Sequence, residues 1–215
     1  MRIFGRPFTG SKTLAGRPVN SMPHLLYIHG FLSSPASHKA VLVKNWLTKN
    51  RPDISYHCPA LSAYPDQAQA SLEGLVESLL PEPLYLLGSS LGGFWATWLV
   101  EKYDLRAVLI NPAVKPSMLK PDYLNVELKN YHTDESYVLG EADVDTLLAA
   151  NVEQVRRVQN YLLMVQTGDE TLDYREAVNK YAGCRQIVEE GGDHSFQGFE
   201  NRIAEAIDFL LEDKA

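Results

Sequence analysis

The stretch Tyr85–Gly93, YLLGSSLGG, is an apolar run that breaks into glycines around two adjacent serines. A short apolar run of this kind is typical of a buried parallel strand. The pattern G-x-S-x-G fits only with Ser90 at its centre, because centring it on Ser89 would require glycine at two positions that are leucines. This pattern predicts a sharp strand-to-helix turn that presents the Ser90 hydroxyl in a strained conformation. Ser90 is therefore the candidate nucleophile.

Outward from this stretch, short apolar runs alternate with segments of helical periodicity. Six runs predict strands: residues 24–30, 54–61, 84–88, 107–111, 161–168 and 185–192. Five segments predict helices: residues 42–50, 66–80, 91–102, 174–181 and 199–211. This alternation predicts an α/β fold, in which a mostly parallel sheet carries helices on both faces. Ligands bind at the carboxyl ends of the strands in such sheets, so functional residues are expected just after strands.

The length of 215 residues fits a single domain, which is expected to cover residues 22–215. Residues 1–21 carry four basic side chains and no acidic one. We interpret them as a disordered basic leader or a mis-assigned start, with a transit peptide as the alternative. Over residues 112–159 the alternation stops. Prolines, aromatics and a helical patch around residues 144–158 predict a small lid insertion there.

A serine needs a base to take its proton, and His194 is the candidate. It follows the last predicted strand directly, in the glycine-containing segment EEGGDHSF, Glu189–Phe196. From that position its ring can reach Ser90 over the end of the sheet. Histidine is also the residue type that changes protonation state near neutral pH. His29, at the end of the first predicted strand, is expected to shape the neighbouring loop instead.

The acid that orients this base is expected after the preceding strand, where VQTGDETLDY, Val165–Tyr174, offers three carboxylates. Asp169 follows the strand directly and is the first candidate. Asp173 is the second, although its place before a predicted helix suits an N-cap. Glu170 is expected to point elsewhere. The resulting order of nucleophile, acid and base along the chain is that of the α/β-hydrolase fold, which is the fold we predict.

Acyl transfer also requires two backbone N–H groups that stabilise the oxyanion. We expect one from Leu91, which follows the candidate nucleophile, and one from Phe31, in the loop after the first predicted strand. The segment FWATW, Phe94–Trp98, offers an aromatic substrate box as one interpretation. Packing of a helix against the sheet is the preferred one, because helix residues after such a turn are usually buried.

Composition and charge exclude several classes of function. The net charge of −7 argues against nucleic-acid partners, which require a basic surface. The sequence contains no run of 18 apolar residues, so no membrane span is expected. The two cysteines, Cys58 and Cys184, form no CxxC or Cys/His cluster, so neither a disulfide framework nor a zinc site is expected. We expect a cytoplasmic protein with no metal or organic cofactor and no membrane partner.

Five segments together resemble the YqiA-like esterases, a small bacterial α/β-hydrolase family. They are LLYIHGFLSSPASHKA, GSSLGGFWATWL, NPAVKP, QTGDETLDYREAV and CRQIVEEGGDHSFQGFE, and the resemblance runs from about Met22 to Leu211. G-x-S-x-G alone is shared by a very large superfamily, whereas the whole set at these spacings is far more specific. The resemblance implies that Ser90 is the nucleophile, Asp169 the acid and His194 the base.

The expected activity is cleavage of carboxylic esters or acyl-CoA thioesters through a covalent acyl-enzyme on Ser90. The resemblance implies esterase activity, with small-molecule acyl esters and acyl-CoA thioesters as substrates. Two alternatives stay open: a non-catalytic binding protein of the same fold, and a lyase or C–C hydrolase that uses the same three side chains. The sequence leaves open the natural substrate, the acyl chain length, the preference for ester or thioester, and the oligomeric state.

Overall fold

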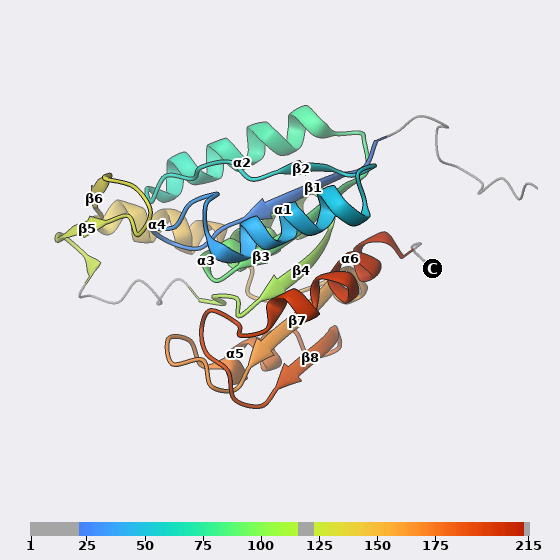
Figure 1. Ribbon diagram of the computed structural model, residues 1–215. Coiled ribbons are helices and arrows are strands. Elements are labelled where there is room, and N and C mark those ends of the chain that lie inside the picture. Colours follow the sequence, from blue (N-terminus) through green and yellow to red (C-terminus); the bar gives the residue numbers. More distant parts are fainter. Residues whose placement is uncertain (1–21, 116–122, 213–215) are drawn as a thin grey trace, which may run out of the picture.

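A six-stranded parallel sheet forms the centre of the protein (Figure 1). The computed structural model describes residues 22–115 and 123–212. In the spatial order β2-β1-β3-β4-β7-β8, the strands are β2 Ser55–His57, β1 His24–Ile28, β3 Leu84–Ser89, β4 Arg106–Ile110, β7 Tyr161–Gln166 and β8 Arg185–Glu189. All six expected strands are present, which confirms the α/β prediction. Most of them end earlier than expected, because the chain turns out of the sheet into the loops at its carboxyl edge.

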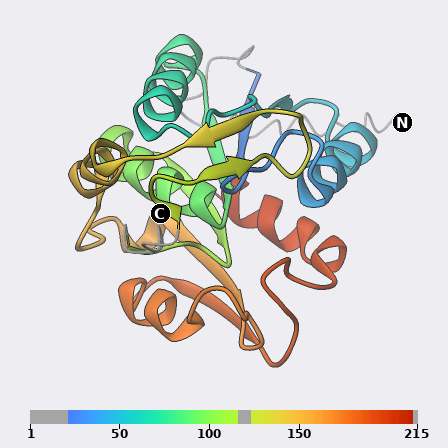
Figure 2. The ribbon, with the colours of Figure 1, turned by 90° about the vertical axis from the view of Figure 1, so that its left-hand side faces the viewer.

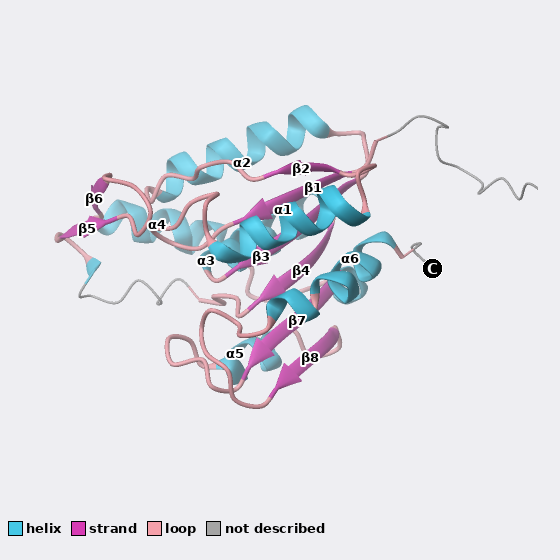
Figure 3. Ribbon diagram, in the orientation of Figure 1, coloured by secondary structure: helices cyan, strands magenta, loops and turns pink. Residues whose placement is uncertain are grey.

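Helices cover both faces of this sheet (Figure 3). They are α1 His38–Asn50 and α6 Ile203–Leu211 on one face, and α2 Pro65–Leu79, α3 Leu91–Tyr103 and α5 Tyr174–Lys180 on the other. The alternation of side chains along each strand divides the core in two. On β1, Leu25 and Tyr27 pack with α1 and α6, whereas Leu26 and Ile28 pack with α2 and α3. Helix α1 begins four residues earlier than expected, since its polar first turn carries no apolar spacing signal.

The segment between β4 and β7 contains a hairpin that the sequence did not predict. Its strands are β5 Glu127–Lys129 and β6 Ser136–Val138, which pair antiparallel. They are followed by α4 Glu141–Ala150, which begins and ends earlier than the expected helical patch. Seen from the carboxyl ends of the sheet strands, the hairpin lies in front of the sheet (Figure 2). The expected leader and residues 116–122 of the expected lid lie outside the described residues.

Two hydrogen bonds join this hairpin to the loop after β1. The Tyr131 backbone N–H donates to the Leu32 carbonyl at 2.8 Å, and the Asn130 side-chain amide donates to the Ser33 carbonyl at 3.1 Å. Tyr137 of β6 also packs against Leu32 in a small apolar cluster. The hairpin is therefore fixed to a loop that follows the sheet, and we propose that it belongs to a lid.

The fold places a crevice at the carboxyl ends of β1 and β3. These two strands are neighbours in the sheet, yet α1 and α3, which follow them, lie on opposite faces. The loops therefore diverge and leave a ligand-sized opening between them, as in other open parallel sheets. All six residues of β3 are buried, so the strand that leads to Ser90 is rigidly enclosed. Within residues 22–115 and 123–212, no helix has the length and apolar character needed to cross a membrane.

Candidate active site

Ser90 occupies the turn between β3 and α3 in a strained backbone conformation. Its φ of 54° and ψ of −122° lie outside the regions that L-residues ordinarily adopt. Three backbone hydrogen bonds hold it there: its N–H donates to Ile110, and its carbonyl accepts from Gly93 and Ala113, at 3.1, 2.9 and 3.0 Å. Strain of this type costs on the order of 1–3 kcal/mol and persists only where the surroundings enforce it. The predicted sharp turn is thus present.

The two glycines of the G-x-S-x-G pattern are required by close backbone packing. A Cβ atom at Gly88 would overlap the carbonyl group of Gly92. A Cβ atom at Gly92 would overlap the carbonyl oxygen of Ile28 in β1. The first turn of α3 therefore rests directly on the backbone of β1, which leaves the Ser90 side chain facing the crevice.

The structure brings Ser90, His194 and Asp169 into one hydrogen-bonded chain. His194 Nε2 lies 3.0 Å from Ser90 Oγ, and His194 Nδ1 lies 2.8 and 3.0 Å from the two carboxylate oxygens of Asp169. The Asp169 side chain is only 2 % exposed. Its Oδ1 also accepts the backbone N–H groups of Thr171 and Leu172 at 2.9 and 2.8 Å. With Nδ1–H donating to the carboxylate, Nε2 can accept the proton of Ser90.

The other two carboxylates of this segment have different partners. Asp173 caps α5 by accepting the backbone N–H of Arg175 at 3.0 Å, and its carboxylate also pairs with the Arg175 guanidinium. Glu170 does not point elsewhere, and that expectation was wrong. Its Oε2 accepts the backbone N–H of His194 at 3.0 Å, so it fixes the main chain of the candidate base. No local sequence signal indicates this contact, because the two residues are 24 positions apart.

Two buried amides, Asn111 and Gln166, hold the loop that carries His194. The Asn111 amide nitrogen donates to the carbonyls of Asp193 and His194 at 2.9 and 3.1 Å. Gln166 Oε1 accepts the backbone N–H groups of Asp193 and Gln197 at 3.2 and 2.8 Å. Asn111 Oδ1 accepts the backbone N–H of Gln166 at 3.0 Å, which links the two residues. Sequence reasoning missed both residues, although each is a polar residue at the end of an apolar strand.

Phe31 and Leu91, the expected oxyanion donors, flank Ser90 at the crevice. The loop after β1 approaches closely, since a Cβ atom at Gly30 would lie 3.3 Å from Ser90 Cβ. Phe31 follows Gly30, Leu91 begins α3, and both residues line the pocket described below. Their backbone N–H groups remain our candidates for the oxyanion hole.

His29 shapes this loop, as expected. The residue is 3 % exposed, and its ring connects two chain segments. Nδ1–H donates to the Gly30 carbonyl at 2.9 Å, and Nε2 accepts the Leu61 backbone N–H at 3.1 Å. Burial lowers the pKa of His29 from its ordinary value, which favours the neutral ring that this pair of bonds requires. Among the hydrogen bonds of the described residues, none joins the His29 ring to Ser90.

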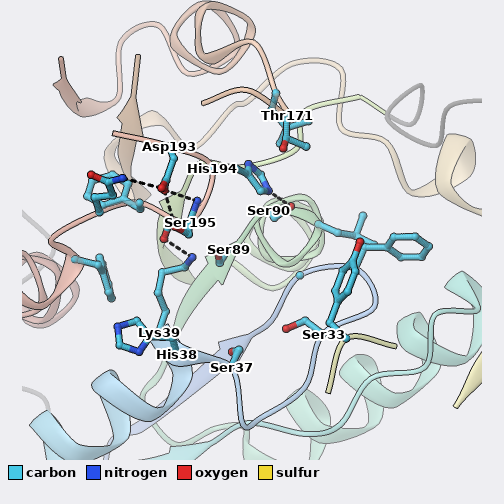
Figure 4. A pocket seen from close by; sticks show the side chains of 18 of the residues that line it. Ser33, Ser37, His38, Lys39, Ser89, Ser90, Thr171, Asp193, His194 and Ser195 are labelled. Atoms are coloured by element: carbon cyan, nitrogen blue, oxygen red, sulfur yellow. Dashed lines mark hydrogen bonds between the residues drawn. The ribbon is translucent and has the colours of Figure 1, made fainter. Parts of the chain in front are cut away.

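A pocket of about 920 Å³ opens beside Ser90 and His194 (Figure 4). Its walls come from the loops after β1, β3, β7 and β8, together with Tyr123 and Tyr131 of the segment between β4 and β7. Phe94 and Trp95 are buried in the core, so the packing interpretation of FWATW is confirmed for these two residues. In the described ranges, no group of three His, Cys, Asp or Glu side chains is arranged to hold a metal ion.

Comparison with known proteins identifies the family of this chain. Residues 24–211 match the protein family UPF0227, described as an uncharacterised protein family. The chain belongs to the UPF0227 family. It is 26 % identical over 175 residues to the UPF0227 protein YcfP of Salmonella gallinarum, a match that covers 80 % of this chain and 91 % of the relative. This agrees with the resemblance to the YqiA-like esterases drawn from the sequence.

Solved structures show the fold of this UPF0227 chain to be that of the α/β hydrolases. Mouse alpha/beta hydrolase domain-containing protein 10 superposes with a TM-score of 0.70 at 14 % identity, covering 89 % of this chain and 91 % of the other. The esterase domain of a Rhodothermus marinus protein superposes with a TM-score of 0.61 at 16 % identity, covering 90 % of this chain and 87 % of the other. The predicted fold class is thereby confirmed.

Proposed function

We propose that this UPF0227 protein is a serine hydrolase that cleaves carboxylic esters or acyl-CoA thioesters. The observation that carries the proposal is the hydrogen-bonded chain from Asp169 through His194 to Ser90. Acyl transfer requires a nucleophile, a base and an acid in contact. Here the strained serine has a base 3.0 Å from its hydroxyl, and a buried carboxylate lies behind that base. Its position beside a substrate-sized pocket gives the acyl group a place to bind.

In the proposed acylation step, His194 Nε2 takes the proton of Ser90 Oγ while Oγ attacks the carbonyl carbon. The carbonyl π pair moves onto oxygen, and the N–H groups of Phe31 and Leu91 stabilise this oxyanion. When the tetrahedral intermediate collapses, the bond to the alcohol or thiol breaks. The leaving group then receives the proton from His194, while Asp169 stabilises the transient imidazolium.

In the proposed deacylation step, a water molecule replaces the leaving group. His194 takes one proton of the water, and the resulting hydroxide attacks the acyl carbon. Collapse of the second intermediate returns the proton to Ser90 Oγ and releases the carboxylic acid. The cycle is a net hydrolysis and uses only these side chains and water, so it requires no cofactor.

The test is the intact mass of the protein after exposure to a fluorophosphonate probe. Wild type is expected to gain one adduct, and Ser90→Ala none, with ester hydrolysis falling by at least about 10⁴-fold. Ser89→Ala is the matched control, because it removes the neighbouring hydroxyl and should keep the adduct.

Three outcomes separate the possible functions. A folded wild type that gains no adduct would favour the non-catalytic binding protein. An adduct on Ser90 without hydrolysis of esters or thioesters would favour a lyase or C–C hydrolase. An adduct together with hydrolysis would support the proposal.

A further inference from the structure

The N-terminus of α1 opens into the same pocket as Ser90. Ser37, His38 and Lys39, which are the N-cap and the first two residues of this 13-residue helix, all line the pocket. The first N–H groups of a helix lack intrahelical partners and carry positive partial charge, so they attract anions. The first turn contains no acidic side chain, and the Ser37 side chain does not cap it. This helix terminus is therefore available to a negatively charged ligand.

The Ser37 hydroxyl is a second, independent indication of a ligand. Its oxygen is buried, yet it has no hydrogen-bond partner among the described residues. A buried polar group without a partner is destabilising, so such groups are uncommon unless a ligand or water satisfies them. Figure 4 shows Ser37, His38 and Lys39 on one wall of the pocket, across from Ser90 and His194.

Lys39 adds a full positive charge to this wall. It is the only Lys or Arg among the described residues that line the pocket. Its Nζ donates to the Ser195 carbonyl at 2.7 Å, and no carboxylate of the described residues lies within ion-pair distance of it. Burial lowers the pKa of Lys39 to about 8, against the opposing effect of Asp193 and Asp169. A desolvated ammonium group without a paired anion favours an anionic ligand.

Most acidic side chains of the pocket already have partners. Glu170 accepts the backbone N–H of His194, while Asp169, which binds the ring of His194, is not one of the lining residues. Asp193 accepts hydrogen bonds from the Ser195 N–H and from the Gln197 side chain. Glu200 also lines the pocket and lies in the 3-10 helix Phe199–Asn201. The Lys39 ammonium is thus a positive charge on this wall whose hydrogen-bond partner, the Ser195 carbonyl, is neutral.

We propose that the α1 N-terminus, the Ser37 hydroxyl and the Lys39 ammonium bind a negatively charged group of the substrate, a carboxylate or a phosphate, while Ser90 attacks its acyl carbon. This inference rests on the proposed hydrolase function and specifies its substrate class. The substrate is an ester or thioester that carries an anionic group on its acyl or its leaving side.

The test compares charged and neutral esters of matched shape. On the acyl side, p-nitrophenyl hydrogen glutarate is compared with p-nitrophenyl pentanoate. On the leaving side, phenyl acetate with a 4-phosphate group is compared with 4-methoxyphenyl acetate. Wild type is expected to show a kcat/KM at least about 10-fold higher for the charged member of one pair, because a desolvated charge pair discriminates strongly. The pair that shows this preference identifies which side of the substrate carries the charge.

Variants then identify the residues responsible. Lys39→Met should reduce the charged-to-neutral ratio at least about 10-fold, and Lys39→Arg should retain most of it. Ser37→Ala should lower the charged-to-neutral ratio, because the anionic group loses a hydroxyl that has no partner in the free protein. Lys44→Met is the matched control: this exposed lysine lies on the same helix outside the pocket, and its loss changes the net charge equally.

The pH dependence gives a further readout. Because the pKa of Lys39 is lowered to about 8, its charge is present below that pH and is lost above it. The charged-to-neutral ratio of wild type should therefore fall as pH rises past about 8, whereas that of Lys39→Arg should not. Asp193 and Asp169 raise the pKa of Lys39 against the larger effect of burial, and hydrogen bonds from Ser195 and Gln197 lower the pKa of Asp193.

Failure of this inference can be told apart from failure of the proposed function. If the fluorophosphonate labels Ser90 but Lys39→Met leaves both ratios unchanged, the anion site is wrong and the hydrolase proposal stands. If no ester is hydrolysed, calorimetric titration with glutarate and with inorganic phosphate tests the site directly. Binding that is lost in Lys39→Met and kept in Lys44→Met would support it, and equal or absent binding in all forms would overturn it.

Discussion

Asp169 and Asp173 lie four residues apart and differ in what their carboxylates contact. Asp169 is buried against the ring of His194, whereas Asp173 caps α5. At the residue scale, this contrast provides a matched pair of substitutions. Asp169→Asn should lower kcat by about 10⁴-fold, since an amide cannot hold the His194 tautomer that accepts a proton from Ser90.

Asp173→Asn should leave kcat unchanged, because asparagine caps helices as well as aspartate does. Steady-state hydrolysis of one neutral ester by both variants checks the pair. Comparable losses in the two variants would contradict the assignment of the acid.

Asn111 is a positioning residue in this scheme, because it contacts the loop of His194 and not the reacting atoms. Its φ of 39° is positive, so Asn111→Gly removes the side chain without adding backbone strain. We expect kcat to fall on the order of 10²-fold with KM nearly unchanged, since a loosened loop misplaces the base. The fluorophosphonate labelling rate should fall in parallel while the circular dichroism spectrum is retained. An unchanged labelling rate in the folded variant would show that Asn111 does not position the base.

At the scale of elements, the contact of α3 with β1 sets the position of the nucleophile. Gly92→Ala places a methyl group on the Ile28 carbonyl, and neither backbone can move aside easily. We expect the free energy of unfolding to fall by at least about 3 kcal/mol, the upper end of ordinary overpacking costs. Denaturant unfolding measures the change.

Gly74→Ala in α2 is the control for that substitution. A Cβ atom at Gly74 meets no heavy atom within 4 Å, and alanine has the higher helix propensity. This variant should gain roughly 0.5–1 kcal/mol. If both variants lose stability to a similar extent, the tight contact between α3 and β1 is not the cause.

The elements also differ in how well the sequence predicted them. The central strands were found because they are buried on both faces and form continuous apolar runs. The β5–β6 hairpin was missed, because each strand has three residues and only Leu128 and Tyr137 face inward. Its partner in the structure is the loop after β1, about 100 residues away, which no local pattern can indicate.

At the scale of the whole molecule, folding moves Lys39 out of water into the pocket wall. The pKa of Lys39 is about 8 in the folded protein and about 10.5 for an ordinary lysine. The folded state therefore binds the Lys39 proton less tightly than the unfolded state does. The resulting destabilisation is fully present below pH 8 and is relieved as pH rises from about 8 to about 10.5.

The free energy of unfolding of wild type minus that of Lys39→Met should consequently rise over that pH window, by at most about 1.4 kcal/mol per pH unit. Taking the difference removes the other titrating groups that the two proteins share. Urea unfolding at a series of pH values measures it, and Lys44→Met serves as the control with a flat difference. A flat difference for Lys39→Met would mean that Lys39 stays hydrated.

The sequence by itself determined the alternation of strands and helices, the position of Ser90, and the choice of His194 and Asp169 as its partners. These features depend on local signals: apolar runs, glycines beside a serine, and polar residues that follow strands. Only the tertiary structure decided which residues hold the His194 loop in place and which residues line the pocket beside Ser90. The His194 loop is held by contacts with Asn111, Gln166 and Glu170, and the α1 N-terminus lines the same pocket as Ser90. Both arrangements bring together residues that are far apart in the chain. Such contacts exist only once the sheet has brought the ends of its strands together.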